Sequence, residues 1–341
     1  MTNFQIVLIN EKVHESFPGY RRDFVLTELP IWADFRVSDI MHVSNIGEVP
    51  LTYAALEDDA SLDVFLAALK QKNSAENIVL GRTGNVVVLD WPSLFSRMSN
   101  PKSIRKIQVG KVPSEYYCMK KTDLISIVEG IARPVLRNSA VRHLFEGVLF
   151  SSFESIVDIE GFSFLIRNAL EYYRENLKTG VHLRQSGFLE VYGAMRPVST
   201  SQIVIGEGAV VKNSILGNGA KVNGMIEDSV IFNGVSIGRN AYVNSSVILP
   251  PSVVEDGVTI ENALVLGGEG AVIKRESVVG GKTLVINKRF PDILKNGLTV
   301  VGEGTAVPRE SRIGSGCLVY GKNERNQQPL NIPAGETVMT G

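Results

Sequence analysis

The sequence predicts an α/β domain followed by a β-solenoid, and three observations lead to this fold class. Glycine is concentrated late in the chain, with 10 of the 32 glycines in residues 1–190 and 22 in residues 191–341. Before residue 190, short apolar runs alternate with segments of helical periodicity. From Ile205 onward, an aliphatic residue recurs about every six positions. Neither helices nor hairpins have a period of six, so the repeat indicates a solenoid.

The first part contains the elements of a mixed α/β domain. Apolar runs with the length of buried strands occur at Phe4–Ile9, Asn77–Leu80 and Val86–Leu89. Helical spacing of apolar residues predicts helices at Ser61–Lys72, Leu124–Ile131 and Ser163–Leu177. We therefore expect a largely parallel sheet flanked by helices, ending at about residue 195.

The second part, residues 198–341, carries the repeat. The recurring aliphatic residues are Ile205, Val211, Leu216, Val222, Ile237, Val243, Leu249, Val254, Ile260 and Leu266, and later Val301, Val307, Ile313, Val319, Ile332 and Val338. A second repeat of 17 residues is superimposed on this period. Similar segments begin at residues 229, 246 and 263, with the sequences Ser-Val-Ile-Phe, Ser-Val-Ile-Leu and Ala-Leu-Val-Leu. Three near-hexads would form one triangular coil with its aliphatic residues inward. Residues 267–300 interrupt the period and are expected to form an excursion, with a helical turn at Phe290–Leu294.

Composition excludes several functional classes. Hydrophobic residues make up 44% of the 341 residues, which is enough for two packed cores. With 35 basic and 36 acidic residues the net charge is −1, so we expect no nucleic-acid partner. The two cysteines form no zinc or disulfide pattern, and we expect no metal site. Without a long apolar run or a signal-like start, we expect no membrane partner and a cytoplasmic protein.

The hexads resemble the left-handed parallel β-helix of hexapeptide-repeat proteins. Many of these are acyltransferases, which the resemblance implies would carry a general-base histidine on the solenoid. The four histidines here are His14, His42, His143 and His182, so none lies in residues 200–341. A base that titrates near neutrality is hard to replace, which argues against acyl transfer.

The whole chain resembles the glucose-1-phosphate adenylyltransferase (ADP-glucose pyrophosphorylase) family. The matching segments are Pro30-Ile-Trp-Ala-Asp-Phe-Arg-Val-Ser-Asp39, Asn77-Ile-Val-Leu-Gly-Arg-Thr-Gly-Asn85, Val109-Gly-Lys-Val-Pro113, Ile156-Val-Asp-Ile-Glu-Gly161 and the solenoid residues 188–265, in the family order. The resemblance implies a reduced Rossmann-like nucleotidyltransferase domain before the β-helix. It also implies that Arg36, Asp39, Lys111 and Asp158 are remnants of a phosphate or sugar site.

The departures from the family pattern concern the phosphates and the metal. Asn10–Glu15 replaces the glycine-rich loop whose N–H groups would cradle a nucleotide, and Leu26 replaces a lysine. The family's metal-binding aspartate aligns with Gly84, or with Asn85 if the gap shifts. The chain is also short where the sugar-binding part would lie, between Asp90 and Lys111. Asp158 falls at the second metal carboxylate, but a lone carboxylate makes a poor metal site, so we assign no metal ligand and no catalytic residue.

The chain is most similar to the degenerate, non-catalytic regulatory subunit of that family. This resemblance implies a regulatory or scaffolding protein of glycogen or glucan synthesis that needs no cofactor. It implies homo-oligomers and a catalytic adenylyltransferase as partner. Two alternatives stay open: an active sugar-1-phosphate nucleotidyltransferase with an atypical site, which would use magnesium, and a hexapeptide structural or assembly protein.

Overall fold

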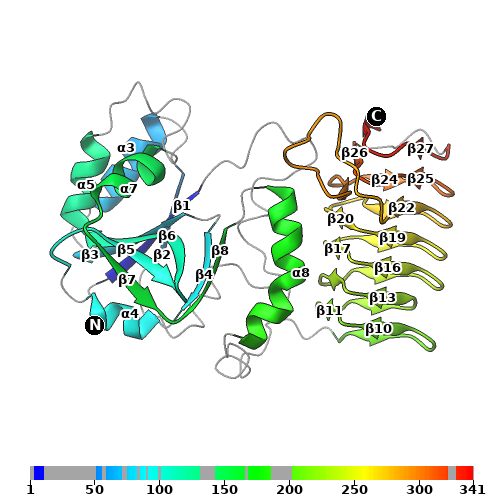
Figure 1. Ribbon diagram of the computed structural model, residues 1–341, viewed down its shortest axis with the longest axis horizontal. Coiled ribbons are helices and arrows are strands. Elements are labelled where there is room, and N and C mark those ends of the chain that lie inside the picture. Colours follow the sequence, from blue (N-terminus) through cyan, green and yellow to red (C-terminus); the bar gives the residue numbers. More distant parts are fainter. Residues whose placement is uncertain are drawn as a thin grey trace. The chain divides into compact units, whose positions relative to one another are not determined.

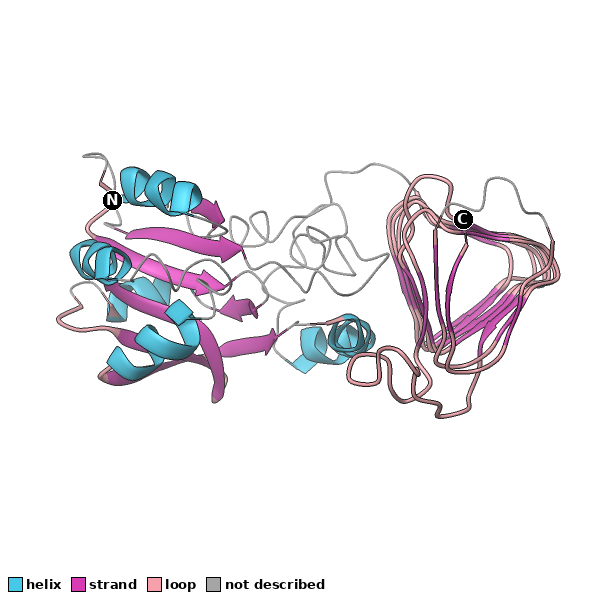
Figure 2. Ribbon diagram, turned by 90° about the horizontal axis from the view of Figure 1, so that it is seen from above, coloured by secondary structure: helices cyan, strands magenta, loops and turns pink. Residues whose placement is uncertain are grey.

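The computed structural model describes residues 4–10, 51–55, 59–70, 75–82, 85–89, 91–98, 101–130, 143–165, 168–185, 202–321 and 328–340. These residues form two compact units. Unit 1 contains the described residues up to 165, and unit 2 contains residues 168–185 and 202–340. Figures 1 and 2 show the α/β architecture of unit 1 and the solenoid of unit 2. The predicted boundary near residues 195–198 lies outside the described residues.

Unit 1 is built on a six-stranded sheet with the order β2-β1-β3-β6-β5-β7. Its strands are β1 (Phe4–Asn10), β2 (Leu51–Ala55), β3 (Asn77–Arg82), β5 (Arg105–Val109), β6 (Val112–Lys120) and β7 (Ser155–Ile159). All neighbours are parallel except β6, which is antiparallel to both β3 and β5. A separate antiparallel pair joins β4 (Asn85–Leu89) to β8 (Gly161–Leu165). The largely parallel, Rossmann-like sheet expected from the sequence is confirmed.

Helices cover both faces of this sheet. They are α3 (Asp59–Leu69), α4 (Trp91–Arg97), α5 (Lys121–Gly130), the π-helix η3 (His143–Leu149) and the single turn α7 (Phe150–Ser152). Ile6 and Leu8 of β1 pack with α4, whereas Val7 and Ile9 pack with α3, α5 and η3. Because consecutive strand residues point to opposite faces, a strand buried on both faces is apolar throughout, as Phe4–Ile9 is.

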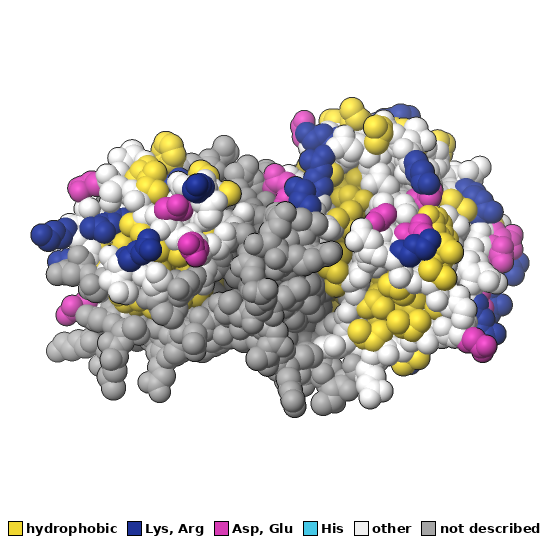
Figure 3. Space-filling model, turned by 60° about the horizontal axis from the view of Figure 1, so that its bottom comes forward, with side chains coloured by type: hydrophobic (Ala, Val, Ile, Leu, Met, Phe, Trp, Pro, Cys, Tyr) yellow, Lys and Arg dark blue, Asp and Glu magenta, His cyan; other side chains and the backbone are white. Residues whose placement is uncertain are grey.

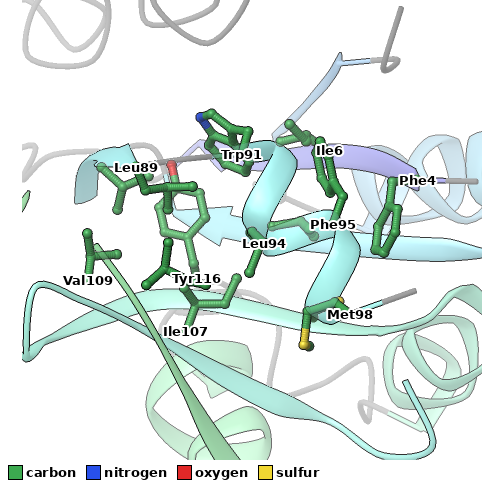
Figure 4. Close-up of a cluster of buried hydrophobic side chains, with 14 of the residues drawn as sticks. Phe4, Ile6, Leu89, Trp91, Leu94, Phe95, Met98, Ile107, Val109 and Tyr116 are labelled. Atoms are coloured by element: carbon green, nitrogen blue, oxygen red, sulfur yellow. The ribbon is translucent and has the colours of Figure 1, made fainter. Parts of the chain in front are cut away.

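The core on the α4 face is aromatic (Figure 4). Trp91 is fully buried, and its ring centroid lies 5.9 Å from that of Phe95 and 6.5 Å from that of Tyr116. Tyr116 depends on Gly81 of the neighbouring strand, because a Cβ at residue 81 would lie 2.4 Å from the Tyr116 ring. Trp91 is therefore a core residue of unit 1.

Unit 2 is a left-handed β-helix whose coils contribute one short strand to each of three parallel sheets, so that its cross-section is triangular (Figure 2). The first face consists of β9 (Val204–Ile205), β12 (Lys221–Val222), β15 (Ser236–Ile237), β18 (Val253–Val254), β21 (Val272–Ile273) and β24 (Ala306–Val307). The second face consists of β10 (Val210–Lys212), β13 (Met225–Glu227), β16 (Tyr242–Asn244), β19 (Thr259–Glu261), β22 (Val278–Gly280), β25 (Arg312–Ile313) and β27 (Asn331–Ile332). The third face consists of β11 (Ile215–Leu216), β14 (Val230–Ile231), β17 (Val247–Ile248), β20 (Ala263–Val265), β23 (Thr299–Val301), β26 (Leu318–Tyr320) and β28 (Thr337–Met339).

The register of the third face explains the 17-residue repeat and corrects some of the inward residues predicted from the six-residue period. Ile231, Ile248, Val265, Val301 and Val319 are paired in succession along the solenoid. In the coils before the excursion, the step from the second face to the third is therefore five residues, and the predicted Leu249 and Leu266 lie one position after this row. Their neighbours Val230, Val247, Leu264, Val300 and Leu318 are also buried. Adjacent apolar residues recur here because both surfaces of this sheet are covered.

The helix α8 (Ala169–Gln185) packs on the third face of the solenoid near β17. The Tyr173 hydroxyl lies 2.6 Å from the carbonyl oxygen of Ser245, to which it donates, and 2.9 Å from Oδ1 of Asn262. Both partners are corner residues with positive φ, 45° at Ser245 and 50° at Asn262. The helix that the sequence predicts from Ser163 is wrong for its first residues, because Ser163 belongs to β8.

The excursion from the solenoid is shorter than predicted. β21 and β22 keep the regular register with β18 and β19, so the chain leaves the coil only after Gly280 and returns at Thr299. The predicted helical turn is present, since the Leu294 amide donates to the Phe290 carbonyl at 2.8 Å. Asn287 is fully buried and anchors the excursion, because its side chain donates to the carbonyls of Gly316 and Glu336.

Candidate functional site

The carboxyl ends of five parallel strands in unit 1 meet at one edge of the sheet. They are the ends of β1, β2, β3, β5 and β7, at Asn10, Ala55, Arg82, Val109 and Ile159. In open α/β sheets, ligands bind outside this edge. We therefore take it as the candidate functional site. Predicted site residues Arg36 and Asp39 lie outside the described residues, as do Leu26 and Gly84.

The structure brings the other two predicted residues, Lys111 and Asp158, together. Gly110 and Lys111 form the two-residue turn between β5 and β6, with φ of 56° and 65°. A non-glycine residue rarely adopts this conformation without support. The support comes from Asp158, whose Oδ1 accepts the Lys111 backbone N–H at 3.2 Å. Asp158 thus stabilises a hairpin through one oxygen, and both side chains are exposed.

A second cation borders Asp158. Arg97, at the end of α4, donates from Nη1 to the backbone carbonyl of Asp158 at 3.0 Å. Its side chain is exposed. Arg97 thus contacts the backbone of Asp158, and Lys111 contacts its carboxylate through the backbone N–H. Two cationic residues and one acidic residue therefore lie together near the end of β7, where their charges partly offset one another.

A polar cluster that the sequence patterns did not indicate lies at the end of β3. Arg82 is 4% exposed, and its Nη1 lies 3.1 and 3.2 Å from the two carboxylate oxygens of Glu115. Asn85 accepts the Glu115 backbone N–H and donates to Ser163 Oγ at 2.8 Å. The signal in the sequence was a lone arginine at the end of a fully buried strand. A buried charge needs a partner, and such a residue marks an ion pair.

The cluster determines the charge at the end of β3. If the family's metal-binding aspartate aligns with Asn85, a neutral amide stands in its place and bonds to β6 and β8. The local carboxylate, Glu115, is already paired with Arg82. Within the described part of the chain, no group of three or more His, Cys, Asp or Glu side chains is placed to hold a metal ion.

The described helices include none with the length and apolar character needed to cross a membrane.

Comparisons with known proteins find one matching family model and several similar adenylyltransferases. A family model described as "GlmU-like, C-terminal hexapeptide" matches residues 197–301. The chain is similar to the glucose-1-phosphate adenylyltransferase of Desulfitobacterium hafniense, at 30% identity over 115 residues, or 33% of this chain and 28% of the relative. It is also similar to the enzyme of Clostridium beijerinckii, at 41% identity over 83 residues, or 24% of this chain and 21% of the relative.

These matches are partial. The aligned segments span between a fifth and three tenths of the relatives' length, at 21% and 28%. The similarity supports a relation to glucose-1-phosphate adenylyltransferases and to hexapeptide-repeat proteins. What those enzymes do as whole proteins is a proposal for this chain.

Proposed function

We propose that this chain is a catalytically degenerate relative of glucose-1-phosphate adenylyltransferases, and that it regulates or scaffolds glycogen or glucan synthesis in the cytoplasm. The observation that carries the proposal is the polar cluster at the end of β3. There the buried Arg82 pairs with the partly buried Glu115, and the neutral Asn85 is one of the two residues with which the family's metal-binding aspartate aligns.

Nucleotidyl transfer needs a metal to neutralise charge as it develops on the phosphates. An ion pair that is already satisfied offers no free carboxylate to such a metal. Removing one electrostatic element of this kind typically costs about 10²–10³ in rate. The replaced glycine loop at Asn10–Glu15 and the replaced lysine at Leu26 would act on the same transition state.

The hydrogen bond of Asp158 also supports a catalytically degenerate site. One of its oxygens accepts the Lys111 amide, so its position follows from the needs of the β5–β6 turn. Arg36 and Lys111 would still favour phosphate binding through their charge, which allows a ligand to bind without being converted. The vestigial site is therefore proposed as a place for binding rather than for chemistry.

The test is pyrophosphate release from ATP with a panel of sugar-1-phosphates and magnesium. We expect no measurable turnover with glucose-1-phosphate. The Asp158→Asn variant is run beside the wild type, because asparagine keeps Oδ1 for the Lys111 amide and removes the charge. Robust turnover in the wild type that disappears in this variant would show a rebuilt, magnesium-dependent active site.

As partners we propose further copies of this chain and a catalytic adenylyltransferase. Sheet faces and solenoid ends that expose apolar residues are commonly covered by association. Purified chain should be dimeric or tetrameric in light scattering at micromolar concentration. Mixing with a catalytic adenylyltransferase should change the activity of that enzyme or its sensitivity to effectors.

A second candidate is a hexapeptide structural or assembly protein without a sugar-nucleotide role. The observation favouring it is that the matched family model covers only solenoid residues, 197–301. Titration calorimetry with ATP and with hexose phosphates separates the two candidates. Binding of either ligand favours the adenylyltransferase-like function, and absence of both favours the assembly role.

A further inference from the structure

Residues 91–114 of unit 1 carry positive charge without any carboxylate. The segment contains no Asp or Glu, and its five cations are Arg97, Lys102, Arg105, Lys106 and Lys111. Among the residues that the structure describes, none of the five forms an ion pair. Figure 3 shows Lys and Arg side chains close together on the visible face of unit 1. A patch of this kind attracts anionic groups.

Arg105 is the cation whose surroundings most require an anion. Its side chain is partly buried, and its guanidinium has one hydrogen-bond contact in the described part of the chain, from Nη1 to Met98 Sδ at 3.8 Å. Nε of Arg105 is buried and has no acceptor among the described residues. Burial raises the pKa of the neighbouring Cys118 thiol to about 12, although the Arg105 charge acts to lower it, so the protonated thiol supplies no negative charge. An oxyanion would satisfy this guanidinium.

The cross-strand neighbour of Arg105 on the edge strand is Ser155. The register of the parallel strands β5 and β7 pairs these two residues. The next pair on the same side, Ile107 with Val157, packs in the core on the α4 face. Because side chains alternate along a strand, Arg105 and Ser155 point to this face and Asp158 points to the opposite one. The serine hydroxyl therefore lies beside a guanidinium and apart from the carboxylate of its own strand.

Ser155 is accessible from outside the molecule. It is the first residue of β7, which is the last strand of the sheet, and its side chain is exposed. Among the described residues its hydroxyl makes no hydrogen bond. Exposed edge segments with few buried residues belong to the parts of a fold that open locally at low cost. A modifying enzyme can therefore reach this hydroxyl.

We propose that Ser155 is a phosphorylation site and that Arg105 binds its phosphate. A protein kinase supplies the phosphoryl group from a nucleoside triphosphate. Ser155 Oγ bonds to the γ-phosphorus, the bond from this phosphorus to the bridging oxygen breaks, and the nucleoside diphosphate leaves. The hydroxyl proton passes to the base of the kinase. The product carries a charge of about −1.5 to −2 at pH 7, and its oxygens match the guanidinium fork.

Phosphorylation changes how the edge of the sheet is held together. The guanidinium of Arg105 exchanges the weak Met98 contact for charge-assisted hydrogen bonds that join β5 to β7. At their carboxyl ends the same two strands carry the turn at Lys111 and its acceptor Asp158. The modification therefore acts on the two strands that border the candidate functional site.

The first experiment uses the full chain with phosphoserine incorporated at position 155 during translation. Phosphorus-31 NMR gives the second pKa of the phosphate, which is about 6 without a charged neighbour. Arg105 should lower this pKa by at least about 0.5, because a nearby positive charge favours the dianion. Arg105→Gln should abolish the lowering. Glu154, the carboxylate directly before Ser155, is present in both forms, so the comparison isolates the effect of Arg105.

The matched control carries phosphoserine at Ser126, which is exposed on α5. Its pKa should not respond to Arg105→Gln. In the otherwise native chain, the phosphate at position 155 should have the lower pKa of the two, and this comparison holds even if Arg105→Gln does not fold. Equal pKa values at the two positions, or no response of position 155 to Arg105→Gln, overturn the contact.

The second experiment tests the source of the phosphate. Phosphopeptide mapping of the chain isolated from its own cells, both growing and starved, should find phosphate on Ser155, and its absence in both overturns the modification. Millimolar inorganic phosphate should leave the thermal unfolding of the unmodified chain unchanged. Stabilisation by free phosphate that Arg105→Gln removes would assign the site to a soluble anion instead. These readouts do not involve nucleotidyl transfer, so their failure leaves the proposed function untouched.

Discussion

Asp158, which the family resemblance aligns with a metal carboxylate, accepts a backbone hydrogen bond in this protein. Its Oδ1 supports the left-handed Lys111 amide at 3.2 Å. We expect Asp158→Ala to lower the free energy of unfolding by about 1 kcal/mol, the worth of one hydrogen bond. Asp158→Asn, which keeps the acceptor, should stay within about 0.5 kcal/mol of the wild type. Urea unfolding followed by tryptophan fluorescence measures both, and equal losses in the two variants would contradict this role.

The two cysteines provide a second prediction at the residue scale. Burial raises the pKa of the Cys118 thiol from 9 to about 12, and burial also raises the pKa of Cys317. The folded state thus favours the protonated thiol of Cys118. The stability that this contributes is fully present below pH 9 and is lost as the pH rises towards 12.

The corresponding measurement is thiol labelling. At pH 8, neither cysteine should react with an aromatic disulfide reagent in the native protein, and both should react in urea. The urea concentration at the unfolding midpoint should decrease as the pH is raised from 9 to 12. Cys118→Ala should make this decrease smaller. Rapid native labelling would show that a thiol is accessible.

At the scale of elements, serines stacked at one corner hold successive coils together. Ser246 Oγ accepts the buried Ala263 N–H at 3.2 Å, and Ser229 Oγ accepts the Ser246 N–H at 3.0 Å. Ser246→Ala leaves the Ala263 amide without its acceptor, and we expect a loss of about 1–3 kcal/mol. The control is Ser246→Thr, which retains the oxygen. Thermal unfolding of the solenoid, followed by circular dichroism, should rank the wild type and threonine above alanine.

At the scale of the whole molecule, the two compact units have separate cores. Trp91 is in the core of unit 1, and the other tryptophan, Trp32, lies outside the described residues. In a Trp32→Phe variant, tryptophan fluorescence should therefore follow unit 1, whereas circular dichroism follows both units. We expect the two signals to have different midpoints in urea, since cooperative unfolding is a property of one core. Coincident midpoints would mean that the units unfold together.

The solenoid and the α/β sheet could both be predicted from the sequence. Period is a local property: alternation in strands and the six-residue repeat are both written in residues that are close along the chain. The six-residue period misplaced Leu249 and Leu266, because one corner of the coils before the excursion takes five residues rather than six. It also extended the excursion over β21 and β22, whose register with β18 and β19 depends on coils distant in sequence.

The contacts of the site residues depend on how the strands pack and could not be predicted from the sequence. Lys111 and Asp158 are 47 positions apart, and Arg82 and Glu115 are 33 positions apart. Whether such a pair forms depends on which strands become neighbours, which no short-range pattern encodes. The burial of the third face by α8 is of the same kind, since it needs Tyr173 to reach Ser245 and Asn262. Local periodicity specifies elements, and only their packing specifies which polar groups are satisfied and which surfaces remain exposed.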